Sequence, residues 1–83
     1  MELNSELERL QKYAVVEQEL NRAKKKHPEY PECNYKRLAI MQEEAGEVTK
    51  AVLHHEYEKG TVEDIKEELI QTAAMCMRML ENL

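Results

Sequence analysis

Two clusters of acidic and amide side chains have residue types and a spacing that could do chemistry. The first contains Glu44 and Glu47, and the second contains Glu68 and Gln71. Residues three positions apart on an α-helix share one face, so each pair presents its oxygen atoms side by side. If the two helices pack together, the four side chains make a cluster of oxygen ligands. Hard cations such as Mg²⁺ and Mn²⁺ prefer such ligands, so the spacing predicts a metal site at these four residues.

Length and composition describe the protein that must hold this site. The chain has 83 residues, and we expect residues 1–83 to form a single domain whose core is small enough to favour homo-oligomerisation. Two Gly, two Pro and no Trp or Phe, beside many Glu, Lys and Leu, are typical of helices. A formal net charge of -5 argues against nucleic acid as a partner, because phosphate binding depends on Lys and Arg.

The cysteines and the apolar runs indicate the cellular setting. Cys33 and Cys76 are far apart and belong to no Cys-x-x-Cys pattern, so we expect reduced thiols with neither a disulfide nor a zinc site. The longest apolar run, residues 73–77, is too short to cross a bilayer, and the first residues do not resemble a signal peptide. These features predict a cytoplasmic protein with no membrane partner.

Apolar residues recur every three or four positions in three segments, which predicts an all-α fold with three main helices in a small antiparallel bundle. The first helix is expected to begin at Ser5, whose spacing to Glu8 fits a capping box, and to end at the lysines of 24–26. These lysines suit the negative end of the helix dipole as a solvated helix end, which the acidic overall balance favours, or alternatively form a patch that binds phosphate or nucleic acid. The apolar stripe of this helix is Leu3, Leu7, Leu10, Ala14, Val16, Leu20 and Ala23.

The second and third helices carry the two clusters. The second is expected from around Asn34 to Glu58, with Gly60 as its stop, and the third from its cap at Thr61 to the end of the chain. Glu44, Glu47, Glu68 and Gln71 flank the apolar stripes of these helices, where a site between helices would be built. The stripes are Leu38, Met41, Ala45, Val48 and Val52, and Val62, Ile65, Leu69, Thr72, Cys76, Leu80 and Leu83. A second apolar set on the third helix, Ile70, Ala73, Ala74 and Met77, predicts a subunit interface.

The pair Glu44-x-x-Glu47, twenty intervening residues and the pair Glu68-x-x-Gln71 resemble the MazG-like family of all-α nucleoside triphosphate pyrophosphohydrolases. The likeness covers mainly residues 38–80, including Glu-Glu-Ala-Gly-Glu at 43–47. The resemblance implies a bundle that forms dimers or tetramers and holds Mg²⁺. It also implies hydrolysis of a nucleoside triphosphate between its α and β phosphates, to the monophosphate and pyrophosphate. The family has Asp where this chain has Gln71, so one anionic ligand is missing.

The remaining roles stay open at the level of sequence. A general base for the attacking water could be Glu43, Glu67 or a carboxylate of the metal cluster. Arg78, two turns beyond Gln71, could contact phosphate or be a surface cation. Base stacking would have to use one of few aromatic side chains, which are otherwise expected to be packing residues. The aromatic candidates are Tyr30, Tyr35 and Tyr57.

The sequence lacks the motifs of several other metal or nucleotide sites. Lys59 stands where a His-Glu-x-x-His zinc site starting at His55 would need its second histidine, and no Glu-x-x-His pattern of a di-iron bundle occurs. The chain also has no Gly-rich phosphate loop. The main alternative is a catalytically weak nucleotide-binding or regulatory bundle, which the neutral Gln71 supports. A purely structural helical module comes third.

Overall fold

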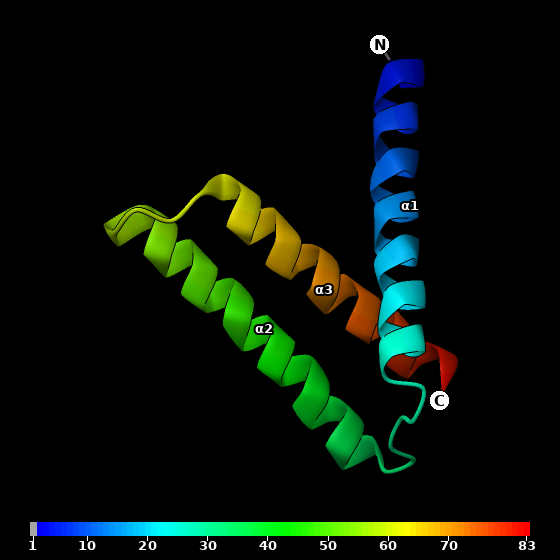
Figure 1. The fold of residues 1–83 in the computed structure, drawn as a ribbon. Coiled ribbons are helices and arrows are strands. Elements are labelled where there is room, and N and C mark those ends of the chain that lie inside the picture. Colours follow the sequence, from blue (N-terminus) through cyan, green and yellow to red (C-terminus); the bar gives the residue numbers. More distant parts are fainter. Residues whose placement is uncertain (1) are drawn as a thin grey trace.

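The computed structural model describes the backbone of residues 2–83 and the side chains of residues 3–83. It contains three helices: α1 (Glu2–Lys26), α2 (Asn34–Tyr57) and α3 (Val62–Glu81). No strand occurs in this described part of the chain. Figure 1 shows α2 and α3 side by side and antiparallel, with α1 crossing the C-terminal half of α3. The predicted all-α fold with three main helices is confirmed.

Local sequence signals decide where α2 and α3 begin and end. The Thr61 side chain accepts a hydrogen bond from the Asp64 backbone N–H at 3.1 Å, and Asp64 Oδ2 accepts one from the Thr61 N–H at 3.4 Å. This capping box confirms the predicted start of α3. At the end of α2 the chain turns back so tightly that a Cβ on Gly60 would lie 2.9 Å from the His55 backbone nitrogen. Glycine is therefore needed at position 60, because a side chain there would collide with the last turn of α2.

The start of α1 differs from the prediction. The helix already includes Glu2, so Ser5 lies within its first turns and does not cap it. No Gly or Pro interrupts residues 2–5, and their side chains are compatible with a helix, so nothing in the chain stops the helix from extending upstream. Met1, the residue before the helix, lies outside the described part of the chain.

Helix α3 is the centre of the fold because it packs against both other helices, whereas α1 and α2 make no close backbone contact in the described part of the chain. Leu20, Ala23 and Ala74 are the buried apolar side chains of the core. The N-terminal half of α1 projects past the α2–α3 pair (Figure 1). The apolar stripe of α1 is therefore exposed in this half of the helix. The side chains with the largest exposed fractions are Leu3, Leu10 and Leu7, at 67, 58 and 50%.

Part of the second apolar set of α3, which was predicted to form a subunit interface, packs within the chain. Ala74 is fully buried inside the chain, and Ile70 and Ala73 line a groove together with Val15 and Val16 of α1. Much of this set therefore faces α1, because α1 crosses α3 on that side. Three apolar side chains of this helix remain exposed: Met77 at 42%, Leu69 at 50% and Leu80 at 63%.

Two buried arginines hold the connection between α1 and α2. The Arg37 guanidinium donates hydrogen bonds to the Pro31 carbonyl (2.6 Å), to Asn34 Oδ1 (3.0 Å) and to the Asn82 carbonyl (2.9 Å). Arg78 donates one to the His27 carbonyl at 2.7 Å. Both guanidinium groups also contact the Tyr30 ring, whose centroid is 5.5 Å from Arg37 Cζ and 4.5 Å from Arg78 Cζ. These contacts, which we call the arginine clamp, tie the linker to the end of α3.

None of the three helices has an apolar stretch of the length and hydropathy that crossing a bilayer requires, as far as the described residues extend.

Candidate functional site

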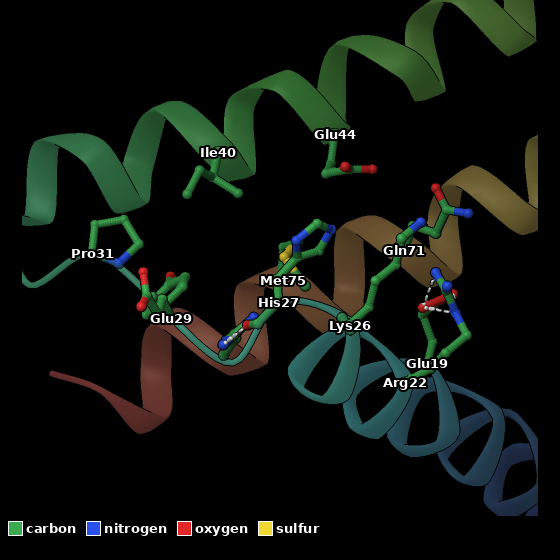
Figure 2. A pocket seen from close by; sticks show the side chains of 13 residues that line it. Glu19, Arg22, Lys26, His27, Glu29, Pro31, Ile40, Glu44, Gln71 and Met75 are labelled. Atoms are coloured by element: carbon green, nitrogen blue, oxygen red, sulfur yellow. Dashed lines mark hydrogen bonds and ion pairs between the residues drawn. The ribbon is translucent and has the colours of Figure 1, made fainter.

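The two clusters predicted from the sequence lie on facing helices. Glu44 of α2 and Gln71 of α3 line the same cavity of about 510 Å³, which lies between these helices and the last turns of α1. Figure 2 shows Glu44 on α2 and Gln71 on α3, with Ile40 and Met75 further along the same two helices. We call this space the Glu44–Gln71 cavity. Its volume is in the range of small-molecule sites.

The other two predicted ligands lie in a neighbouring cavity. Glu47 and Glu68 line a space of about 600 Å³ together with Asp64 and His54. Helical spacing explains the division, because Glu44 and Glu47 are almost one turn apart along α2 and therefore reach different levels of the α2–α3 interface. The structure thus brings all four side chains to one interface but distributes them over two adjacent cavities.

The electrostatics of this interface show that its carboxylates act on one another. Partial burial, followed by the charges of Glu43, Glu47 and Glu19, raises the pKa of Glu44 above 4.5. Partial burial also raises the pKa of Glu68 above 4.5, and the charges of Glu44, Glu47, Glu67 and Asp64 raise it further. Both carboxylates are half-buried and have no Lys, Arg or His within 4.0 Å in the described part of the chain. Neither carboxylate is therefore in direct contact with a cation of the described chain, and the negative charges act on one another.

The chemistry of these donors fits a hard divalent cation. All four side chains offer oxygen atoms. Burial is the main cause of the two raised pKa values, and the repulsion between carboxylates that adds to it is relieved when a cation binds among them. Within residues 3–83, however, no three His, Cys, Asp or Glu side chains are gathered closely enough to hold one metal ion. Binding a cation would therefore require rotamer changes that bring the carboxylates of the two cavities together.

The candidate bases and Arg78 occupy different environments. Glu43 is exposed on α2, and Glu67 is exposed on α3, where it lines a third cavity with Glu19 and Arg22. Arg78 is only 6% exposed and belongs to the arginine clamp, so it is not the surface cation considered from the sequence. It also lines the Glu44–Gln71 cavity, which keeps it near a ligand bound there.

Sequence reasoning missed the contribution of α1 to this cavity. Glu19, Arg22 and Lys26 line it, and so does His27 just after the helix. These α1 residues and Ala23 follow the spacing of one helical face, so the signal was present in the sequence. It went unused because the motif resemblance starts only at residue 38, and because nothing in the sequence shows which face of α1 meets α2 and α3.

The aromatic and histidine candidates lie in different environments. Tyr35 and Tyr57 are 84 and 82% exposed, whereas Tyr30 is held in the arginine clamp and lines the Glu44–Gln71 cavity. His55 Nδ1 lies 2.8 Å from the Gly60 carbonyl, which gives this histidine a role in the turn after α2. Of the three tyrosines, Tyr30 therefore has the position closest to the site.

Comparison with known proteins identifies no relative for this chain: no family model matches it, and no curated protein or solved structure is similar to it. The function must therefore be argued from the geometry and chemistry of the α2–α3 interface.

Proposed function

We propose that this protein is a MazG-like, metal-dependent nucleoside triphosphate pyrophosphohydrolase. It would convert a ribo- or deoxyribonucleoside triphosphate to the monophosphate and pyrophosphate. The observation that carries the proposal is the meeting of the two motif halves at one interface, where the pKa values of Glu44 and Glu68 are raised by burial and by neighbouring carboxylates. Such a concentration of uncompensated carboxylates is typical of a functional site.

The residues divide into those that hold the cation and those that surround the substrate. Glu44, Glu47, Glu68 and Gln71 would hold Mg²⁺ or Mn²⁺, which neutralises triphosphate charge and makes pyrophosphate a better leaving group. Glu43, Glu67 or a carboxylate of the metal cluster would accept the proton of the water that attacks the α-phosphorus. Ile40 and Met75 also line the Glu44–Gln71 cavity and supply apolar surface to the substrate.

The alternative is a catalytically weak bundle that binds or senses a nucleotide. Gln71 favours it, because an amide oxygen binds Mg²⁺ without adding negative charge. The division of the four side chains over two cavities favours it as well. Both functions use the same cavity and differ in whether the bound triphosphate is hydrolysed.

Release of pyrophosphate decides between these functions. The full-length protein is incubated with a panel of nucleoside triphosphates and Mg²⁺, and the products are measured. We expect monophosphate and pyrophosphate in equal amounts, with no activity after chelation of the metal. Release of inorganic phosphate and a diphosphate instead would contradict cleavage between the α and β phosphates. Nucleotide binding without turnover would establish the regulatory alternative.

The same proposal includes a homo-oligomer, a dimer or a tetramer, and the surface of the single chain supports it. The accessible surface is 6710 Å², whereas a monomer of 9.8 kDa is expected to expose only about 5,200 Å². The radius of gyration is 14.4 Å, against about 12 Å expected for a compact domain of this length. If two chains covered their excess surface, they would bury about 3,000 Å² in total, which is the range of obligate homodimers.

Light scattering at micromolar concentration tests this part of the proposal. We expect a mass of at least two chains for the native protein, and a lower mass for Leu7→Glu, which places a charge on the exposed apolar face of α1. Glu6→Gln, on the neighbouring position, serves as the control and should keep the native mass. A monodisperse monomer for the native chain would refute the oligomer.

A further inference from the structure

The three lysines at the end of α1 have three different environments, although they are consecutive in sequence. Lys24 Nζ lies 3.1 Å from the Glu81 carboxylate of α3. Lys25 is exposed and lies outside the Glu44–Gln71 cavity, whereas Lys26 lines that cavity. Successive residues on a helix point about 100° apart, which explains the divergence. The lysine run is therefore more than a uniform helix end, and only its last member faces the candidate site.

Lys26 stands on the α1 wall of the cavity, across from Glu44 on α2. Figure 2 shows Lys26 and Arg22 on α1, with Glu44 on the opposite helix and Gln71 on α3. The charge of Arg22 is already balanced, because its Nη2 lies 2.7 Å from Glu19 Oε2. No carboxylate lies within 4.0 Å of Lys26 Nζ among the residues that the structure describes. Lys26 thus offers an uncompensated positive charge to the cavity.

Arg78 supplies a second positive charge from α3, on another wall of the same cavity. Its side chain is only 6% exposed, and yet it lines the cavity. A guanidinium has five N–H donors, and Nη2 donates to the His27 carbonyl, while no carboxylate of the described side chains lies within 4.0 Å. A buried cation without an anionic partner is costly, so this guanidinium is suited to receive an anion.

We infer that Lys26 and Arg78 bind the pyrophosphate half of the substrate, which later leaves as inorganic pyrophosphate. The inference rests on the proposed function and gives its polyphosphate a direction. The α-phosphate lies toward the carboxylates of α2 and α3, and the terminal phosphates lie toward the end of α1. Two cations from separate elements match an anion with several charges, and they stabilise the negative charge that develops on the departing group.

Inorganic pyrophosphate is the probe for this site, and the lysine run supplies its own control. Calorimetric titration of the full chain in the presence of Mg²⁺ should show binding that Lys26→Gln weakens by about 10-fold, the loss of one charge-assisted contact. Lys25→Gln removes the same charge from the adjacent exposed position and should leave the affinity unchanged. Arg78→Lys keeps the charge but loses the planar guanidinium, and it should weaken binding while circular dichroism shows native helix content.

The outcomes separate this inference from the proposed function. The pyrophosphate site at Lys26 and Arg78 is overturned if Lys26→Gln and Lys25→Gln have equal effects on binding. It is also overturned if the native chain does not bind pyrophosphate at millimolar concentration. Hydrolysis that persists with unchanged KM in Lys26→Gln also overturns it, while leaving the proposed function intact. Binding that depends on Lys26 in a chain without hydrolytic activity keeps the anion site and rejects catalysis.

Discussion

Replacing Glu68 by Gln is expected to abolish the stabilisation of the fold by Mg²⁺. Without metal, the pKa of Glu68 lies above 4.5 in the folded chain, so ionisation destabilises the fold increasingly as the pH rises from 4.5 through that raised pKa. At pH values above the raised pKa the cost is fully present, and Glu68→Gln should raise the unfolding midpoint there. Well below pH 4.5 the carboxylate is protonated in both the folded and the unfolded state, and the two midpoints should coincide.

Addition of Mg²⁺ should invert this order. At a concentration about 100 times its Kd, a ligand of the folded state adds about 2.7 kcal/mol, which corresponds to a midpoint shift of roughly 10–20 °C for a chain of this size. The native chain should show this shift and Glu68→Gln should not. The rate of hydrolysis by Glu68→Gln should be about 100-fold lower than that of the native chain, equivalent to about 2.7 kcal/mol of transition-state stabilisation.

Two further variants make this experiment specific. Glu63→Gln changes an exposed glutamate of α3 that pairs with Lys66 at 3.4 Å, and it should behave like the native chain in both conditions. Gln71→Asp adds a carboxylate and should tighten Mg²⁺ binding and leave hydrolysis equal or faster. If Glu68→Gln and Gln71→Asp both respond to Mg²⁺ as the native chain does, α3 does not contribute to a metal site.

Loss of the arginine clamp is expected to have the largest effect on the fold. Arg37→Met removes three hydrogen bonds that a charged group donates. The carbonyl oxygens of Pro31 and Asn82 then lose the Arg37 guanidinium as their donor. Charged hydrogen bonds of this kind contribute about 1.5–3 kcal/mol each, and they are not additive. We expect a loss of about 3 kcal/mol or more, which lowers the unfolding midpoint by roughly 12–24 °C.

The neighbouring residue provides the control for this measurement. Lys36 is exposed on the same turn of α2, and Lys36→Met should change stability by no more than about 0.5 kcal/mol. Thermal unfolding followed by circular dichroism measures both variants. Equal midpoints would mean that the clamp contacts do not stabilise the linker. Because the linker residues His27, Tyr30 and Pro31 line the Glu44–Gln71 cavity, we also expect Arg37→Met to weaken nucleotide binding.

Local rules in the sequence were sufficient for the helices and for the start and stop signals around α3. The spacing of apolar residues predicted three helices, and the Thr61 cap and the end of α2 near Gly60 were located correctly, because these features depend on neighbouring residues. The same reasoning failed at Ser5. A capping pattern does not start a helix when the residues before it are also able to be helical.

The faces of the helices were decided by tertiary structure alone. Periodicity shows that a helix has an apolar side but not which neighbour covers it. For this reason Ala74, assigned to a subunit interface, is buried within the chain, while Leu7, in the apolar stripe of the first helix, is exposed. Arg37 and Arg78 gave no sequence signal as buried residues, because their partners are backbone carbonyls of the linker and of the chain end.

The candidate site divides in the same way. Motif spacing within one helix placed Glu44 near Glu47 and Glu68 near Gln71, and the packing of α2 on α3 brought the two pairs to one interface. The sequence alone could not show that they would line two cavities, or that Lys26 would face one of them from α1. Those outcomes depend on the crossing of α1 over α3, which is set by contacts between residues far apart in the chain.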